Sequence, residues 1–214
     1  MPIVGLMQGS EHYRKKYELG VIDVSNSLEA YNRFLVNASE LKPLGEFVSE
    51  ALRTKQKVRV LDIGCGTAGT LHDLKQKFGK KIETVGIDLI AFPKKNADLG
   101  LIGDAFELEW PSGFDLVFSF RSLHEIGNAR KLITKVSHCL APGGVALLLF
   151  RLRNVVNQNI EWSGDMTETD ELFLFEIGQT QKWEHCRVSS RVSFEELADG
   201  SQTPVGLLLK LKKK

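Results

Sequence analysis

The sequence has no apolar run approaching the roughly 20 residues that a membrane-spanning helix needs. In residues 1–16, no apolar segment follows the charged residues, so this segment does not resemble a secretory signal. Cysteine is scarce, and Cys65, Cys139 and Cys186 are scattered and odd in number. Such cysteines fit reduced thiols better than a disulfide framework or a zinc site. We therefore expect a cytoplasmic protein without membrane association.

Neither sign of charge is in excess: the sequence has 28 Lys and Arg residues and 27 Asp and Glu residues, which gives a net charge of +1. The overall electrostatic field of a near-neutral chain does not attract polyanions, so nucleic-acid binding would need a local basic patch. The 5 histidines are dispersed, and the sequence indicates no metal cluster. With 43% hydrophobic residues among 214, the chain is not disordered and suits one domain, or one domain with appendages.

Helical and extended patterns divide the chain near residue 58. Before that point, apolar residues recur three and four positions apart, which predicts helices, and Pro43 separates two helices or opens the second. From there, largely apolar runs alternate with amphipathic helical segments, which is typical of a parallel sheet covered on both faces. The first five predicted strands are 58–63, 82–88, 99–104, 114–120 and 145–150.

The segment after the fifth strand is less regular. A helix is expected around 170–177, and two further strands, 183–192 and 205–212, can pair as an antiparallel hairpin at one sheet edge. The complete prediction is an α/β fold: a Rossmann-like, doubly wound sheet of seven strands, mostly parallel with an antiparallel C-terminal strand, plus N-terminal helices. Residues 1–57 would form a helical lid or appendage and residues 58–214 a single compact domain, with the first strand central.

A glycine-rich loop joins the first predicted strand to a helix. Gly64, Gly66 and Gly69 match the pattern G-x-G-x-x-G, in which the turn is tight and a ligand lies against bare backbone. Asp88 ends the second strand about 20 residues beyond the last glycine, where an acid accepts hydrogen bonds from both ribose hydroxyls. The two signals together predict an adenosine-type ligand.

Two further acids bear on which adenosine-type ligand it is. Asp62 stands two residues before the loop; a carboxylate there does not help a pyrophosphate but suits a methionine amine and a cationic sulfonium. Asp104 follows the third strand and can accept from an adenine amino group, while Phe106 can pack on the ring. These positions favour S-adenosylmethionine over a nicotinamide dinucleotide, which stays the alternative.

These segments resemble a known family. The run from Val60 to Gly69 is similar to the first motif of the class I S-adenosylmethionine-dependent methyltransferases. Four later segments, 86–88, 103–105, 114–117 and 140–144, resemble its later motifs in order and at familiar spacing. The resemblance covers residues 58–150 and is specific to the superfamily but not to a substrate.

The resemblance implies that S-adenosyl-L-methionine is the cofactor. The glycine loop would line its methionine portion, Asp62 would reach the amino group, Asp88 would hold the ribose, and the segment from Asp104 would frame the adenine. Ser119, Phe120 and Arg121 would lie under the sulfonium and face the acceptor. The expected cofactor-binding residues are Asp62, Gly64, Cys65, Gly66, Gly69, Asp88, Leu89, Asp104, Ala105, Phe106, Ser119 and Arg121.

His124 is the candidate catalytic residue, because it follows the fourth strand where the acceptor should lie. It would act as a general base or position the acceptor, and the alternative is that it packs on the cofactor pocket. Tyr13, Tyr17, Tyr31 and Arg33 could form a lid or reach the cofactor carboxylate, or have ordinary packing and surface roles.

The acceptor is not readable from the sequence, but some classes lack their signatures. No Asn-Pro-Pro-Tyr-like run follows the fourth strand, as an amino-group methyltransferase of nucleic acid or glutamine would carry, and no Pro-Cys stands there. The function we favour is therefore methyl transfer to a small-molecule acceptor. An RNA or protein methyltransferase and a non-catalytic cofactor-binding module are the alternatives, each of which would use the same cofactor fold.

Overall fold

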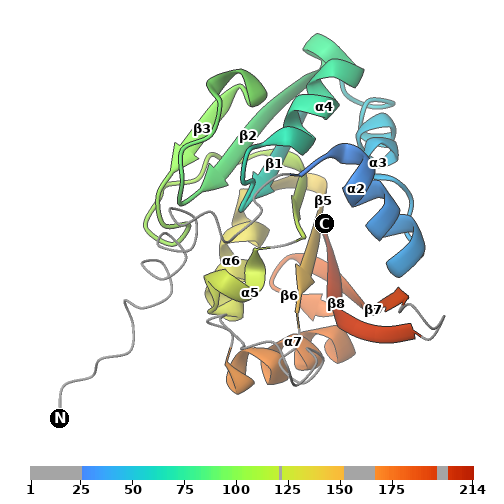
Figure 1. Ribbon diagram of the computed structural model, residues 1–214. Coiled ribbons are helices and arrows are strands. Elements are labelled where there is room, and N and C mark those ends of the chain that lie inside the picture. The colour runs from blue at the N-terminus through green and yellow to red at the C-terminus, as the bar shows by residue number, and fades with distance from the viewer. Residues whose placement is uncertain (1–25, 121, 152–166, 197–201) are drawn as a thin grey trace.

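The computed structural model describes residues 26–120, 122–151, 167–196 and 202–214. Their strands form one sheet of 8 strands in the order β3-β2-β1-β4-β5-β8-β7-β6 (Figure 1). The strand bounds are β1 Val58–Ile63, β2 Ile82–Asp88, β3 Leu99–Ile102, β4 Phe114–Ser119, β5 Leu140–Phe150, β6 Lys182–Trp183, β7 Cys186–Glu196 and β8 Gln202–Lys213. The mixed α/β architecture predicted from the alternating pattern is confirmed.

Strand β1 lies at the point where the strand order reverses. It pairs in parallel with β2 on one side and with β4 on the other, while β3 extends the sheet beyond β2 and β5 extends it beyond β4. The first strand is therefore central, as predicted, among the five parallel strands, and it is the third strand of the whole sheet. In open α/β sheets, a reversal of this kind opens a crevice at the carboxyl ends of the strands, where ligands bind.

The C-terminal part of the sheet is antiparallel. Strands β7 and β8 form the predicted hairpin, and β8 also pairs antiparallel with β5, from Val145↔Lys212 to Phe150↔Leu207. Strand β5 is longer than expected because the segment around Gly143 stays in the strand as an irregularity in the pairing with β4. The antiparallel C-terminal strand is confirmed.

The predicted number of seven strands is wrong, because the run 183–192 is two strands. Trp183 pairs with Cys186, so the chain reverses through Glu184 and His185. Glu184 has φ 48°, in the left-handed region that tight hairpin turns require. Such turns usually carry Asn or Gly, and without that signal the alternation of apolar residues reads as one continuous strand.

Helices cover both faces of the sheet. One face is covered by α2 (Leu28–Arg33), a π-helical turn (Phe34–Ala38), α3 (Leu44–Ala51) and α4 (Gly69–Phe78), and the other by α5 (Leu123–Ile126), α6 (Ala129–Cys139) and α7 (Glu168–Thr180) (Figure 1). Short 3-10 turns span Gly79–Lys81 and Lys94–Asn96. Along β1, Val58 and Val60 join the first layer and Leu61 and Ile63 the second, as alternating strand side chains must.

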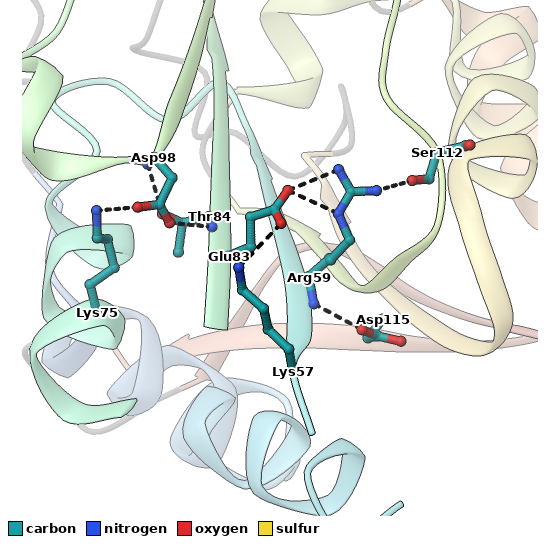
Figure 2. A network of polar contacts seen from close by, with 8 residues as sticks. All are labelled: Lys57, Arg59, Lys75, Glu83, Thr84, Asp98, Ser112 and Asp115. Atoms are coloured by element: carbon teal, nitrogen blue, oxygen red, sulfur yellow. Dashed lines mark hydrogen bonds and ion pairs between the residues drawn. The ribbon is translucent and has the colours of Figure 1, made fainter. Parts of the chain in front are cut away.

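A polar network joins the amino ends of the strands, opposite the crevice (Figure 2). Arg59 of β1 forms an ion pair with Glu83 of β2, with Nη2 and Oε1 3.0 Å apart. Asp115 of β4 accepts a hydrogen bond from Arg59 N at 2.8 Å. On the outer side of β2, Asp98 accepts from Thr84 N at 2.8 Å and pairs with Lys75 at 2.7 Å. The network fixes β2, β1 and β4 to one another at their amino ends, away from the ligand-binding edge.

Among the described helices, none is long and apolar enough to cross a membrane.

The segment that opens the described chain packs on the sheet through buried side chains. Tyr31 of α2 is 4% exposed, and Leu44 of α3, which follows Pro43 as the predicted helix start, is fully buried. Tyr13 and Tyr17 lie outside the described residues.

Candidate functional site

The predicted ligand residues lie along one edge of the sheet. The glycine loop follows β1, Asp88 ends β2, Asp104 follows β3, and Ser119 ends β4. Because these four strands are parallel neighbours, their carboxyl ends share the edge that includes the switch point. The sequence-based site is therefore assembled from four consecutive strand ends.

The glycine loop needs its first glycine for two reasons. Gly64 has φ +69°, and a Cβ on it would lie 2.0 Å from Ser122 Oγ, so no side chain fits. Gly64 N donates a hydrogen bond to Ile87 O at 2.7 Å, and Cys65 N donates to the same oxygen at 3.1 Å. These two bonds hold the start of the loop against the end of β2. The backbone of the loop is therefore fixed before any ligand binds.

Asp62 is a fully buried carboxylate at the end of β1, and neither of its oxygens has a hydrogen-bond partner within the described part of the chain. Burial raises the pKa of Asp62 well above its usual range, and the nearby charge of Asp88 raises it further. An unpartnered buried carboxylate costs free energy unless a donor or cation satisfies it. Either protonation or a donor that is not among the described residues would reduce this cost for Asp62.

Asp88 is almost fully buried, and its carboxylate already accepts hydrogen bonds from backbone N–H groups at the site. Its carboxylate accepts from Gly66 N at 2.7 Å and from Ile90 N at 3.1 Å. Burial raises the pKa of Asp88, and backbone N–H donors from Gly66, Ile90 and Leu89 oppose that shift. Asp88 thus fixes the conformation of the glycine loop, and its predicted contact with a ribose would add to this role.

Asn26 is a site residue that the sequence reasoning missed. Its Oδ1 accepts from Thr70 N at 2.9 Å, and its Nδ2 donates to Cys65 O at 2.7 Å. Helix α4 has Ala68 as its own N-cap, which has no side-chain hydrogen bond to offer, so Asn26 caps the helix from a distant part of the chain. Only a contact across 44 residues reveals this role, and no local pattern could.

The close approach of Asn26 also explains Gly69, the last glycine of the motif. A Cβ at Gly69 would lie 2.1 Å from Asn26 O. Next to it, Leu28 N donates to the carboxylate of Asp73 at 2.9 Å. Hydrogen bonds from Asn26 and Leu28 to Thr70 and Asp73 thereby attach the start of the described chain to the first turns of α4, and Thr70 N is not free for a phosphate.

The segment after β3 forms a compact turn. Asp104 is exposed, and its Oδ1 accepts from Phe106 N at 2.7 Å, while Ala105 is buried and Phe106 half-buried. Leu89, at the start of the loop after β2, is half-buried. These residues lie at the predicted edge, and their contacts with an adenine stay a prediction.

The end of β4 supports the loop from the other side. Ser119 and Ser122 have their hydroxyls 2.7 and 2.9 Å from Ile63 O and 2.8 Å from each other. Phe120 packs edge-on against Tyr31 of α2, with ring centroids 5.0 Å apart. Arg121 lies outside the described residues. His124 lies in α5, and its side chain also lies outside them.

Cys65 has a packing role in the structure. Its sulfur lies where a Cβ on Gly86 of β2 would come within 2.8 Å, and burial raises the pKa of the thiol. A buried protonated thiol is a poor nucleophile and a poor metal ligand. Within the described residues, no group of three His, Cys, Asp or Glu side chains could hold a metal ion.

Comparison with known proteins points to one group. The profile of a family described as "Methyltransferase domain" matches residues 54–185. The chain is 28% identical over 131 residues to a protein of Oryza sativa subsp. japonica named "Probable tocopherol O-methyltransferase, chloroplastic", with 56% of this chain and 35% of that protein covered. It is also 28% identical over 145 residues to norajmaline N-methyltransferase of Rauvolfia serpentina, with 58% and 48% covered. The chain thus spans between a third and a half of the length of these relatives.

A solved structure has a similar fold. It is an S-adenosylmethionine-dependent methyltransferase from Thiobacillus denitrificans in complex with S-adenosyl-L-homocysteine. The TM-score is 0.50 at 16% identity, with 79% of this chain and 91% of that chain covered. At this identity the likeness concerns the fold.

Proposed function

The chain belongs to the methyltransferase-domain family whose profile covers residues 54–185, and from this premise we propose that it transfers a methyl group from S-adenosylmethionine to a small-molecule acceptor. The membership confirms the class I S-adenosylmethionine-dependent superfamily predicted from the motifs, and with it the cofactor. The acceptor and the site residues are the part we propose.

The observation that carries the proposal is the unpartnered carboxylate of Asp62. It is fully buried at the crevice end of β1, and the carboxylate of Asp88 lies close enough to raise its pKa. Two buried acids near the carboxyl ends of neighbouring strands, β1 and β2, favour a cation, such as the ammonium group of a methionine, and disfavour a pyrophosphate. The capped Thr70 N supports the same choice, because this N–H at the start of α4 is not free to bind a pyrophosphate.

The residues of the chain would bind and orient the two reactants. S-adenosylmethionine supplies a methyl carbon that positive sulfur has already activated. Asp62 would hold the ammonium, Asp88 the ribose, and Asp104 the adenine amino group. Alignment of the reactants and exclusion of water can then supply much of the acceleration. A general base is needed only where the acceptor carries a proton at working pH.

The small-molecule acceptor is supported by the relatives and by charge. The two relatives are named for transfer to tocopherol and to norajmaline, and the chain has a net charge of +1. We place the acceptor beyond Phe120, where Tyr31 of α2 and Phe34 of the following π-helical turn supply aromatic side chains. Since Asn26 attaches the start of the described chain to the glycine loop, we propose that residues 26–57, the described part of the N-terminal segment, cover the cofactor as a lid.

Calorimetry on the purified chain tests the cofactor part of the proposal. S-adenosylmethionine and S-adenosylhomocysteine should bind, and NAD should not. Binding of NAD without binding of the sulfur nucleosides would overturn the assignment of Asp62. The acceptor is then sought by cofactor turnover against small-molecule pools, with total RNA and protein extract as the competing substrates.

His124 is tested once an acceptor is known. If it is the general base, His124→Ala should lower turnover by about a hundredfold or more, with cofactor affinity nearly unchanged and one limb of the pH profile lost. A loss confined to cofactor affinity or stability would mean that it packs the pocket. Intact cofactor binding with no turnover on any acceptor pool would instead indicate a non-catalytic module.

A further inference from the structure

Lys135 of α6 reaches across to the turn that follows β3. Its ammonium donates hydrogen bonds to three backbone carbonyls of that turn, Ala105 O at 2.9 Å, Phe106 O at 3.1 Å and Leu108 O at 2.8 Å. A lysine normally pairs with a carboxylate or with water. Here all three of its donors are directed at one short backbone segment, which we call the 104–108 turn.

The 104–108 turn resembles one turn of helix with polar groups at both ends. Asp104 caps the start, because its side chain accepts from Phe106 N at 2.7 Å. Its backbone oxygen accepts from Glu107 N and Leu108 N, each at 3.1 Å. The carbonyls at the end of such a turn have no partner within it, and a cation there satisfies them. Lys135 supplies that cation from another element.

One peptide group connects Lys135 to the Asp104 side chain. The Ala105 carbonyl, which accepts from Lys135, and the Phe106 N–H, which donates to Asp104 Oδ1, belong to the same planar peptide unit. Holding the oxygen therefore fixes the direction of the N–H on the opposite side. The two hydrogen bonds also polarise the shared peptide and strengthen each other.

Aromatic contacts pack around the same lysine. Trp110 Nε1 donates to Ala105 O at 2.9 Å, and Lys135 Nζ lies 5.0 Å from the centre of the Trp110 ring. Lys131, one helical turn earlier on α6, lies over the ring of Phe106 at 4.7 Å. Burial lowers the pKa of Lys135, and the charge of Lys131 adds to this, while Glu107 and Asp104 oppose it. The charged groups around Lys135 thus come from both α6 and the turn.

We propose that Lys135 is a positioning residue that holds the Asp104 carboxylate in the orientation that recognises the amino group of adenine. The proposal rests on the proposed function, since it assigns an adenine to this turn. It adds a residue on α6, outside the sequence motifs, that sets the specificity of the site for its base. Lys135 itself need not touch the cofactor.

The test compares S-adenosylhomocysteine with S-inosylhomocysteine, which carries an oxygen in place of the adenine amino group. Wild-type protein should bind the adenosyl compound more tightly by calorimetry. In Lys135→Met, affinity for the adenosyl compound should fall by about tenfold, as expected for lost hydrogen bonds to a charged group, with little change for the inosyl compound. Lys135→Arg keeps several N–H donors and should restore part of the preference.

Lys77→Met is the matched control. Lys77 of α4 also lies over an aromatic ring, that of Phe78 at 5.5 Å, but α4 packs in the other core layer from Ala105 and α6. The preference of the Lys77→Met variant between the two ligands should equal that of the wild-type protein. If Lys135→Met weakened both ligands by the same factor, or neither, the positioning role would be overturned.

A measurement without ligand separates this proposal from the proposed function. Exchange of the Trp110 indole N–H, assigned by Trp110→Phe, should become faster in Lys135→Met because the Ala105 carbonyl is no longer held from the other side. An unchanged exchange rate would contradict the inference that Lys135 fixes the conformation of the 104–108 turn. Failure of the proposed function would show differently, as wild-type protein that binds neither nucleoside, and it would remove the adenine role as well.

Discussion

Asn26 caps helix α4 through a hydrogen bond from Thr70 N to Asn26 Oδ1 at 2.9 Å. The same side chain donates to Cys65 O at 2.7 Å, so one amide holds both the start of the helix and the glycine loop before it. The two halves of the amide perform separate tasks, because Oδ1 is the helix cap and Nδ2 is the support of the loop. Substitutions can therefore separate them.

For Asn26→Ala, we expect the free energy of unfolding to fall by about 1 kcal/mol, as for other lost N-caps, and cofactor affinity to fall with it. Asn26→Asp keeps the acceptor for Thr70 N but loses the donor to Cys65 O. It should recover the stability and not the affinity. Denaturant unfolding and calorimetry check the two effects, and a fully stable Asn26→Ala variant would refute the cap.

Asp62 makes stability depend on pH. Its raised pKa means that the folded state holds the proton more tightly than the unfolded chain, so its stabilising effect is present at low pH and is lost as pH rises through the folded-state pKa. Asp62→Asn removes the ionisable group. Relative to wild type without cofactor, the variant should therefore become more stable as pH rises, which unfolding measured across pH would show.

The same substitution should abolish cofactor binding, because the amide cannot neutralise an ammonium. In wild type, an ammonium that pairs with Asp62 would favour the ionised carboxylate and release its proton. Affinity should then rise with pH, and the heat of binding should differ between buffers of different ionisation enthalpy. Equal heats in all buffers, with Asp62→Asn binding like wild type, would exclude the pairing.

Asp88→Ala removes an acceptor that the glycine loop already uses and that the ribose is predicted to use. Affinity for S-adenosylhomocysteine should fall by roughly tenfold to a hundredfold, corresponding to about 1–3 kcal/mol. Because Gly66 N also loses its partner, the apo protein should be modestly less stable. Unchanged affinity would move the ribose site to another residue.

Asp115 should affect stability alone. It is buried at the amino end of β4, where it accepts a hydrogen bond from Arg59 N (Figure 2). It also forms an ion pair with Lys55. Asp115→Ala leaves a strand N–H without its acceptor and should cost about 1–3 kcal/mol of unfolding free energy. Cofactor affinity should not change, because this network lies at the opposite edge of the sheet from the glycine loop. A specific loss of affinity would contradict that separation.

The parts of the molecule that could be predicted from sequence are those with a local physical cause. The apolar run of β1, the glycine loop and the acid that ends β2 follow one another within 31 residues, Val58 to Asp88, and each pattern reports its own conformation. The reversal at Glu184 was missed because its backbone adopts a left-handed conformation without the residues that usually signal it.

The supporting residues of the site could not be predicted, because their roles depend on contacts between distant segments. Nothing near Asn26 indicates that it caps a helix beginning at Gly69, and Lys135 looks like any lysine on the polar face of α6. Hydrophobic periodicity specifies which face of a helix is buried, but not which backbone carbonyls a long side chain reaches across the interface. The motifs thus indicated the loop and its acids, and the structure adds what holds them.

The antiparallel insertion of β8 between β5 and β7 has a consequence for folding kinetics. Strands β7 and β8 are neighbours in the chain, so their pairing closes a short loop, and hairpins of this kind form in about 1–10 μs. Every parallel pair of the sheet must instead bring together strands separated by a helix or a long connection, which is slower. When the full chain refolds, the hairpin can therefore exist before the parallel strands β1 to β5 have assembled. Its docking through β8 onto β5 then joins residues that lie 57 to 67 positions apart in the sequence, from Phe150↔Leu207 to Val145↔Lys212. During synthesis, these contacts can therefore form only after β8 has been made.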